Sequence, residues 1–556
     1  MGQTINIAID ENYEDWDIVS PAIEDGGDVI NGIDLLNLKV INDKERLYLY
    51  FNLDSEVNLV NNIISQDLVL HIDTDNDHTT GEKIQSGYGI DLTIDFLKRE
   101  AYYYGTNTTT IYFGDLDFVS APTVSTFNIE FSINRNSTVN EQRIFKADSI
   151  KILLQENEFG DRLPNIGNVY TYGFKDLNQT EYSPIDFEKA NEKLLRVTSY
   201  NVLLNSGWAG ADKLKNLKSI TKAINADVYA FQESRGTNAN EAVDFLNNWL
   251  PITNRTWYAK KSGDLITCSK WPILETWTFE RHLAVLIELP EVYNTNLLII
   301  NNHLSCCSNN EARQDQVDQF CDFLKDAKTE GGNVTIEKNT PIVYLGDFNL
   351  VGFKQQIETI LEGDIQNTTK YGPTFLPDWD STFLADAKPY HSDKNLVYTW
   401  RSLGNSKIYP PGRLDYQFYT DSKLQVDKSF VVNTAEMSAN RLIKYNLIKD
   451  DSEATSDHLP VVVDYSIINT STDVPLIKSG SSNFNLFPNP ANHFINIISN
   501  TQIESIEVRD LTGKLVHRQN GSETKLFTSG LNNGVYILKI KAQGKFAYKR
   551  LVVNHI

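Results

Sequence analysis

Polar residues able to bind a metal ion or a phosphate stand at the ends of successive apolar runs in the middle of the chain. Most of these runs have the length of a β-strand, and each is followed by, contains or is preceded by an amide, a carboxylate or a histidine. Since strand ends meet at the edge of a sheet, such side chains are expected to converge on one cleft. One of them alone would be an ordinary turn residue, but a whole set in one domain is hard to obtain by chance. The set consists of Asn201, Glu233, His303, Asp347, Asn349, Asp415, Asp457 and His458.

Four members of this set are suited to holding a metal ion. The carboxylates of Glu233, Asp347 and Asp457 and the side-chain amide of Asn201 offer hard oxygen atoms, which are the ligands that Mg²⁺, Mn²⁺ and Ca²⁺ prefer. We therefore expect a divalent cation in the cleft, held by these residues.

The other members are suited to handling protons and phosphoryl oxygens. His303 and His458 are acid–base groups, since an unperturbed imidazole has a pKa near ~6.5. Asp415 could hold a histidine in one tautomer and raise its basicity. Asn349 follows Asp347 by two residues, so an extended backbone would place both on one side, where the Asn349 amide could donate to a phosphoryl oxygen. A hard cation with carboxylates and two histidines suits metal-assisted hydrolysis of a phosphate ester.

The elements that carry these residues alternate between strand and helix. The segments 212–225 and 311–328 have apolar residues at helical spacing, between runs typical of buried strands. This alternation over residues 191–468 predicts a layered α/β domain. The strand-like runs span residues 196–203, 227–233, 297–303 and 341–347.

Length and charge limit the organisation of the chain. A length of 556 residues corresponds to about three or four domains. The formal net charge of −22 is concentrated near the N-terminus, since residues 1–190 carry 13 basic and 33 acidic groups, whereas residues 191–468 carry 28 and 35. The mildly acidic middle segment argues against tight non-specific binding of polyanions through a broad basic face. No apolar run approaches the ~20 residues of a membrane span.

Residues 1–190 are predicted to form a β-sandwich, because short alternating or aromatic runs are separated by Gly, Asn and Asp turns. Asp73, Asp75 and Asp77 alternate within one turn, so their carboxylates could converge on a structural Ca²⁺. A solvated turn is the alternative. The segment also resembles the sandwich domains similar to family 9 carbohydrate-binding modules, which implies a sandwich and leaves sugar binding open.

The middle segment contains, in order, the motifs Ser199-Tyr-Asn-Val202, Phe231-Gln-Glu233, Asn302-His-Leu304, Gly346-Asp-Phe-Asn349, Arg413-Leu-Asp-Tyr416 and Ser456-Asp-His458. Together these motifs resemble the endonuclease/exonuclease/phosphatase superfamily, which includes deoxyribonuclease I. The resemblance implies a four-layer α/β sandwich that hydrolyses phosphate esters. It also implies a metal held by Glu233, with Asn201, Asp347 and Asp457 near the same cleft.

The resemblance implies further roles for individual residues. A His458–Asp415 pair would activate or orient the attacking water, and Asn349 would contact phosphate. His303 would be the second acid–base histidine, whose acidic partner the sequence does not identify. The residues that would contact the substrate are Lys270, in place of an arginine of the family's Ser-Arg-Tyr-Pro loop, Trp400 and Arg413.

Residues 483–556 are predicted to form a small all-β module after a polar linker at 469–482. The segments 486–491, 508–514 and 531–537 resemble the type IX secretion sorting domain of Bacteroidetes. That resemblance implies recognition by the type IX secretion machinery, a secreted or cell-surface location, and an upstream signal peptide that this chain does not include. An oxidising destination would favour a disulfide between Cys321 and either Cys306 or Cys307.

These features predict a multidomain protein with an N-terminal all-β sandwich, a central four-layer α/β sandwich and a small C-terminal all-β sandwich. The expected activity is that of a secreted, metal-dependent phosphoesterase acting on a phosphodiester, which could be a nucleic acid, a phospholipid head group or a small diester. A phosphomonoesterase of the same fold and a catalytically silent surface-binding protein are the alternatives. We expect a monomer.

Overall fold

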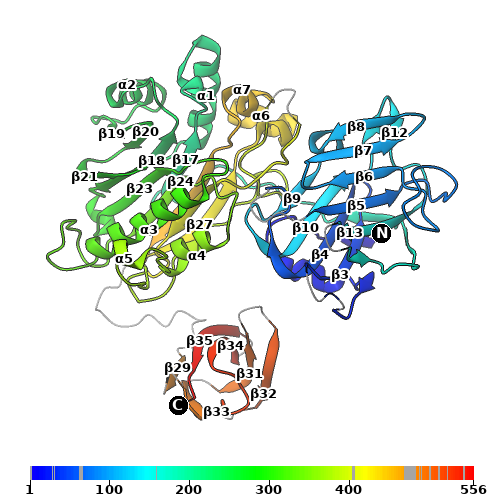
Figure 1. Ribbon diagram of the computed structural model, residues 1–556. Coiled ribbons are helices and arrows are strands. Elements are labelled where there is room, and N and C mark those ends of the chain that lie inside the picture. The colour runs from blue at the N-terminus through cyan, green and yellow to red at the C-terminus, as the bar shows by residue number, and fades with distance from the viewer. Residues whose placement is uncertain are drawn as a thin grey trace. The chain divides into compact units, whose positions relative to one another are not determined.

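The computed structural model describes the chain from residue 3 to residue 555, apart from residues 469–483 and several short gaps (Figure 1). The predicted linker at 469–482 therefore lies outside the described residues. Two compact units are present, Met1–Asn469 and Thr470–Ile556, and most of their regular structure is β-sheet. None of the helices in the described part of the chain combines the length and the apolar character needed to span a bilayer. The short gaps are residues 28, 30–31, 62–66, 158–159, 404–406, 488, 490, 500–501, 511–513, 522–523 and 543–544.

The first part of unit Met1–Asn469 consists of two β-sheets that share one apolar core. Alternate residues of a long strand, Leu47, Leu49 and Phe51, enter this core from one sheet, and Leu70 and Ile94 enter it from the other. The first sheet has the order β2 (Ile23–Glu24), β3 (Leu35–Asn42), β4 (Arg46–Val57), β10 (Thr126–Asn134), β9 (Val119–Ala121). The second has the order β14 (Arg162–Leu163), β13 (Ser149–Glu156), β5 (Leu68–Asp73), β6 (Leu92–Asp95), β7 (Glu100–Tyr104), β8 (Thr108–Tyr112), with β15 (Tyr170–Gly173) beside β13. We call this part the β-sandwich.

The second part of the same unit consists of two six-stranded sheets that face each other across a core of Val, Ile and Leu side chains. Their central strands are buried along their whole length because both faces of each sheet are covered. One sheet has the order β19 (Tyr258–Ser262), β20 (Leu265–Ser269), β18 (Val228–Gln232), β17 (Leu195–Asn201), β28 (Val461–Ile467), β27 (Leu424–Val431). The other has the order β21 (Ile273–Phe279), β22 (His282–Ile287), β23 (Leu297–His303), β24 (Ile342–Asp347), β26 (Asp415–Tyr419), β25 (Ala385–Asp386).

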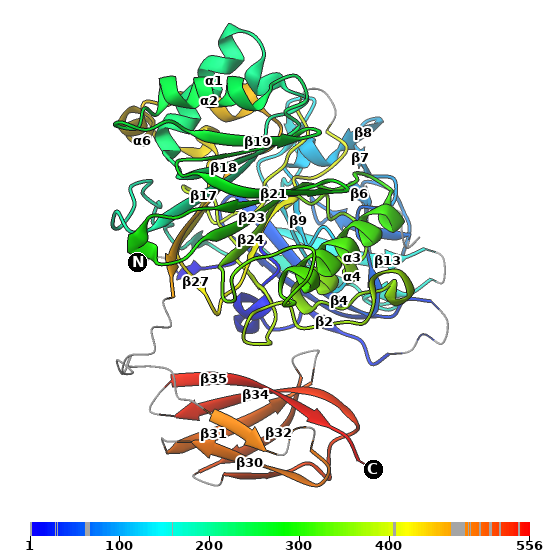
Figure 2. The ribbon, with the colours of Figure 1, turned by 90° about the vertical axis from the view of Figure 1, so that its left-hand side faces the viewer.

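Helices cover the outer faces of these two sheets (Figure 2). Leu217 and Leu246 pack against the outer face of the first sheet, and Val317 and Phe320 pack against the second. We call this helix-covered part the α/β domain. Its helices are α1 (Ala211–Ile224), α2 (Ala239–Trp249), α3 (Asn310–Ala327), α4 (Gln355–Glu362), α5 (Thr368–Tyr371), α6 (Ala439–Tyr445) and α7 (Asp451–Thr455).

The second unit has two small sheets with one shared core, which includes Ile495, Ile506 and Leu538. One sheet has the order β29 (Phe484–Phe487), β30 (Phe494–Ser499), β33 (Lys525–Phe527), and the other the order β32 (Leu515–Asn520), β31 (Ile503–Arg509), β34 (Gly534–Ala542), β35 (Lys545–Val553).

The four cysteines are free, so the expected disulfide is wrong. Cys321 faces the core on α3, where its thiol donates to the carbonyl of Thr359. Cys306 and Cys307 lie exposed in the loop before that helix. The helical periodicity that buries Cys321 keeps it away from the two exposed thiols.

Candidate active site

The topology of the α/β domain places the predicted residues at the same end of its two sheets. β17 and β18 are parallel neighbours, as are β23 and β24, so Asn201, Glu233, His303 and Asp347 stand at carboxyl ends that point the same way. β26 runs antiparallel to β24 and therefore begins at this edge, with Asp415 directly opposite Asp347. The start of antiparallel β28 brings Asp457 and His458 to the same place. Six members of the predicted set line a single cleft, and the other two, Asn201 and Asp415, are hydrogen-bonded to residues of that lining.

Two carboxylates face each other at the floor of the cleft. Ligand atoms of Glu233, His303 and Asp347 lie within 4.8 Å of one another. The side-chain nitrogen of Asn201 donates to Glu233 Oε1 at 3.1 Å and to Asp347 Oδ2 at 2.9 Å. Among the described residues, no lysine or arginine forms an ion pair with either carboxylate. Two hard carboxylates without a fixed cation fit a divalent metal ion such as Mg²⁺, Mn²⁺ or Ca²⁺.

Asn201 and Asp457 lie at this floor in ways the sequence did not indicate. The amide oxygen of Asn201 accepts from the backbone N–H of Leu203 at 3.0 Å, so its nitrogen faces the carboxylates. Asp457 Oδ2 accepts from the indole N–H of Trp400 at 3.0 Å, and Asp457 is not part of the group formed by Glu233, His303 and Asp347.

His458 is held by two carboxylates. Its Nδ1 lies 2.8 Å from Asp415 Oδ2 and its Nε2 lies 3.6 Å from Asp347 Oδ2. Burial opposes the charged imidazole, but the charges of Asp415 and Asp347 outweigh it and raise the pKa of His458. Because Asp415 accepts from Nδ1, the other ring nitrogen of His458 is directed at the cleft.

His303 has an acidic partner that the sequence did not identify. Its Nδ1 lies 3.0 Å from Asp264 Oδ2, in the turn between β19 and β20, and its Nε2 lies 3.6 Å from Asp347 Oδ2. Burial again opposes the charge, while Asp264 and Asp347 raise the pKa of His303. The turn Ser262-Gly-Asp-Leu265 signals a hairpin, but nothing in it indicates which histidine the aspartate meets.

Asn349 lies in the cleft, but its backbone conformation differs from the extended one expected. Its φ is +50°, in the left-handed region, so the backbone is not extended after Asp347. Its backbone N–H donates to Asp347 Oδ1 at 3.0 Å, and its side-chain nitrogen donates to the carbonyl of Leu304 at 3.1 Å. The tight turn, instead of strand alternation, places the amide beside the carboxylate.

Of the three predicted substrate contacts, only Trp400 lines the cleft. Lys270 pairs with Asp227 at 3.1 Å. It follows Ser269, which pairs with Val228 at the start of β18, so the antiparallel run of β20 carries Lys270 to the opposite edge of the sheet. Arg413 is 3% exposed and bonds to Asp386, so its guanidinium belongs to the interior.

The acidic turn in the β-sandwich also differs from expectation. Asp73 and Asp75 come together with Asp91, with ligand atoms within 4.8 Å of one another, whereas Asp77 is exposed and accepts from the backbone N–H of Thr79. The chain turns through a left-handed residue, Asn76, which directs Asp77 away, while the start of β6 brings Asp91 beside β5.

The cleft has a volume of about 510 Å³. Its polar floor is formed by Glu233, His303, Asp347, Asn349 and His458. Its walls are largely apolar, and they include residues of the β-sandwich as well as of the α/β domain. The wall residues are Val60, Asn61, Ser120, Thr123, Leu204, Arg235, Arg281, Leu304, Cys306, Cys307, Val351, Trp400, Tyr409, Pro410, Pro411, Gly412 and Leu414, and Asp457 also lines the cleft.

The family models agree with this geometry. Residues 198–458 match the Endonuclease/Exonuclease/phosphatase family, and residues 485–554 match the Secretion system C-terminal sorting domain. The α/β domain is therefore an endonuclease/exonuclease/phosphatase family domain, which makes the protein a phosphoester hydrolase.

Solved structures of this family are similar over about half of the chain. D. rerio TDP2 with a single-strand DNA product is 14% identical, covering 50% of this chain and 100% of that one, with a TM-score of 0.32. ANGEL2, a 2′,3′-cyclic phosphatase, is 17% identical, covering 50% and 97%, with a TM-score of 0.32. The human Nocturnin catalytic domain is 14% identical, covering 51% and 97%, with a TM-score of 0.30. No protein with curated annotation matches the chain.

Proposed function

We propose that the protein is an exported, divalent-metal-dependent phosphodiesterase. The proposal rests on the position of Asp347 between two histidines. Its Oδ2 atom lies 3.6 Å from the Nε2 atoms of both His303 and His458. Each of these imidazoles has a carboxylate on its other nitrogen. Two separately oriented acid–base groups on either side of a metal-binding carboxylate suit the two proton transfers of ester hydrolysis.

Glu233 and Asp347 would hold the cation, with Asn201 orienting both carboxylates through its amide nitrogen. A cation bound there supplies charge stabilisation to the phosphoryl oxygens and acidifies water. Asp415 keeps one proton of His458 on Nδ1, so Nε2 faces the cleft, where it would take a proton from the attacking water once a cation offsets the charge of Asp347. Asp264 orients His303 in the same way, and we assign His303 to protonating the leaving oxygen.

The first prediction concerns metal dependence. Hydrolysis of bis(4-nitrophenyl) phosphate should require Mg²⁺, Mn²⁺ or Ca²⁺ and should stop in excess chelator. Glu233→Ala should lower kcat at least ~100-fold, since the charge stabilisation supplied by a bound cation is worth several kcal/mol. Circular dichroism should show an intact fold.

Glu275→Ala is the matched control for this prediction, because Glu275 is an exposed glutamate on β21 of the same domain. It should keep wild-type activity. Full activity in chelator, or equal activity of the two variants, would contradict the metal assignment.

A phosphomonoesterase is the alternative activity on the same residues. Comparing kcat/KM for bis(4-nitrophenyl) phosphate with that for 4-nitrophenyl phosphate decides between the two, and a larger value for the monoester would favour the alternative. Metal-dependent turnover of either ester would exclude a catalytically silent surface-binding protein.

Export is supported by the sorting-domain match at residues 485–554. We assign the type IX secretion machinery as the partner of this domain and the cell surface or the medium as the destination. In a bacterium with that machinery, deletion of residues 470–556 should retain the protein inside the cell. Unchanged export of the truncated protein would contradict the assignment.

A further inference from the structure

The β-sandwich is bonded to the loop that follows the catalytic residues of β24. The side-chain nitrogen of buried Asn58 donates to the carbonyls of Val351 at 3.2 Å and Gly352 at 3.1 Å. Thr123 Oγ1 donates to the carbonyl of Leu350 at 2.7 Å, and the backbone N–H of Ser125 donates to the carbonyl of Gly352 at 2.8 Å. These carbonyls come directly after Asn349, so the β-sandwich is attached to the rim of the cleft.

The same part of the β-sandwich lines the cleft itself. Val60 and Asn61, after β4, and Ser120 and Thr123, in and after β9, face the space above the catalytic floor. In the described residues, the walls of this space thus come from two domains. One side of the cleft is therefore formed by the β-sandwich.

An aromatic residue completes this wall with support from the β-sandwich. The guanidinium of Arg99 lies 4.7 Å from the ring centre of Tyr409, and its Nη1 donates to the carbonyl of Val60 at 3.1 Å. A cation over a ring face is attractive, so Arg99 links Val60 and Tyr409 into one surface. Trp400 lies on the same cleft, with its backbone paired to Gly412.

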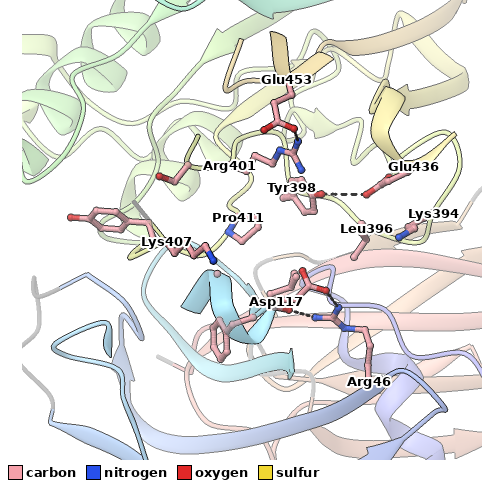
Figure 3. A pocket seen from close by; sticks show the side chains of 15 residues that line it. Arg46, Asp117, Lys394, Leu396, Tyr398, Arg401, Lys407, Pro411, Glu436 and Glu453 are labelled. Atoms are coloured by element: carbon pink, nitrogen blue, oxygen red, sulfur yellow. Dashed lines mark hydrogen bonds and ion pairs between the residues drawn. The ribbon is translucent and has the colours of Figure 1, made fainter. Parts of the chain in front are cut away.

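The far side of this wall is also fixed by interactions between the two domains. A second cavity of about 290 Å³ shares Tyr409 and Pro411 with the catalytic cleft (Figure 3). There the ammonium of Lys407 pairs with Asp115 of the β-sandwich at 2.6 Å. Arg401, next to Trp400, pairs with Glu453 at 2.6 Å (Figure 3). The segment that carries Tyr409 is thus bound to the β-sandwich through Lys407 as well as through Arg99.

The charges disfavour a polyanionic substrate. A nucleic-acid site neutralises a series of phosphates with lysines and arginines. The described residues that line the cleft include two arginines, Arg235 and Arg281, and no lysine, and Arg235 lies 3.8 Å from Asp264. The part of the wall that the β-sandwich forms belongs to a segment, residues 1–190, with 33 acidic and 13 basic groups. One phosphate suits this cleft, whereas the β-sandwich residues that line it, Val60, Asn61, Ser120 and Thr123, offer no cationic group to the flanking phosphates of a duplex.

We propose that the β-sandwich is a specificity wall and that the enzyme hydrolyses single phosphodiesters with compact apolar or aromatic groups, excluding duplex nucleic acid. This inference rests on the phosphodiesterase function proposed above. Binding space of about 510 Å³ is in the range of small-molecule pockets, ~300–1,000 Å³. The apolar walls would contact the organic group while the polar floor binds the phosphate.

The test compares substrates on the full chain with saturating metal. We expect kcat/KM for benzyl methyl phosphate, whose leaving group is an alkoxide as in DNA, to exceed that for duplex DNA, per phosphodiester, by at least ~100-fold, because like-charge contacts cost several kcal/mol. Duplex DNA should also fail to inhibit hydrolysis of the small diester. Faster cleavage of DNA would overturn the inference while leaving the proposed phosphodiesterase function in place.

Wall variants test the assigned residues. Tyr409→Ala should raise KM for bis(4-nitrophenyl) phosphate about 3–10-fold, the range expected for one aromatic contact, with a smaller effect on methyl 4-nitrophenyl phosphate. Tyr258→Ala, at an exposed tyrosine outside the cleft, is its control. Val60→Asp should also raise KM, whereas Val169→Asp, at an exposed valine of the β-sandwich, should not.

Equal KM values for each variant and its control would overturn the proposal that these residues form a substrate-binding wall. If no ester were hydrolysed, the proposed function would fail. Calorimetry of diphenyl phosphate binding to the wild type and to Tyr409→Ala would then test the wall without catalysis. Weaker binding by the variant would support the assignment of Tyr409 to the wall, and equal affinities would overturn it.

Discussion

His303 and His458 have closely matched environments. Each has Nε2 at 3.6 Å from Asp347 Oδ2 and Nδ1 bonded to a carboxylate, Asp264 for His303 and Asp415 for His458. The two imidazoles are therefore distinguished by which side of the scissile bond each one faces. Their assigned roles, acid on the leaving side and base for water, predict different responses to the leaving group.

His303→Ala should lose most activity on an alkyl phosphodiester and much less on a 4-nitrophenyl diester, whose leaving group needs no proton. The difference between the two substrates should be ~10²–10⁴-fold, the contribution of a general acid. His458→Ala should lose activity on both substrates equally. Steady-state kinetics of the two variants provide the measurement. A flat response of His303→Ala would instead indicate that both histidines only hydrogen-bond phosphoryl oxygens.

Asp264 is a positioning residue for His303 and does not touch the cleft floor. Asp264→Ala should lower kcat about 10–100-fold, the usual cost of losing such a partner. The loss should be greater for the alkyl diester, as for His303→Ala. Asp244→Ala, at an exposed position on α2, serves as the control. An equal loss on both substrates would show that Asp264 acts on folding and not through His303.

At the scale of elements, β5 and the start of β6 form a second acidic site. Asp73 and Asp91 are buried, and Asp73 Oδ2 also pairs with Lys151 at 3.0 Å. Burial raises the pKa of Asp91, which a bound cation would offset. We propose that Asp73, Asp75 and Asp91 bind a structural Ca²⁺, with Asp77 outside the site.

Calcium should stabilise the β-sandwich by mass action, about 2.7 kcal/mol at a concentration 100 times Kd. Melting should be measured in the Glu233→Ala background, so that the catalytic site does not contribute. Asp91→Asn should abolish the calcium-dependent rise in Tm, whereas Asp77→Asn should keep it. The proposal fails if Tm is the same in calcium and in chelator.

At the scale of the whole molecule, buried histidines make unit Met1–Asn469 sensitive to acid. Burial lowers the pKa of His282 to about 3, and burial with Arg162 lowers that of His71 to about 4. Because the unfolded chain takes up these protons near pH ~6.5 and the folded chain does not, stability is complete above that pH and is lost below it. Each histidine contributes up to ~1.4 kcal/mol per pH unit.

Urea unfolding at pH 7 and pH 5 measures this loss. All eight tryptophans precede residue 470, so tryptophan fluorescence reports on the first unit alone. His282→Gln should be less stable than wild type at pH 7, because His282 Nε2 bonds to the buried hydroxyl of Tyr344. That difference should shrink by ~2 kcal/mol at pH 5, because the variant has no imidazole to protonate when unfolded. A constant difference would contradict the assignment.

Much of the catalytic set is predictable from the sequence, because each member sits in a short motif at a strand end. A buried strand and the polar residue after it are both local signals, and parallel strands must bring such ends to one edge. This is why Asn201, Glu233, His303 and Asp347 can be grouped from the sequence alone. The shared edge is seen in the pairing of β17 with β18 and of β23 with β24.

Other features depend on contacts between distant segments, which no local pattern encodes. Asp264 meets His303 only through strand register, and the opposite course of β20 carries Lys270 away from the cleft. The wall depends on Asn58, which bonds to Gly352 across 294 residues of sequence. Spacing along the chain predicts which side chains share a strand end, whereas folding alone decides which domain closes the cleft above them.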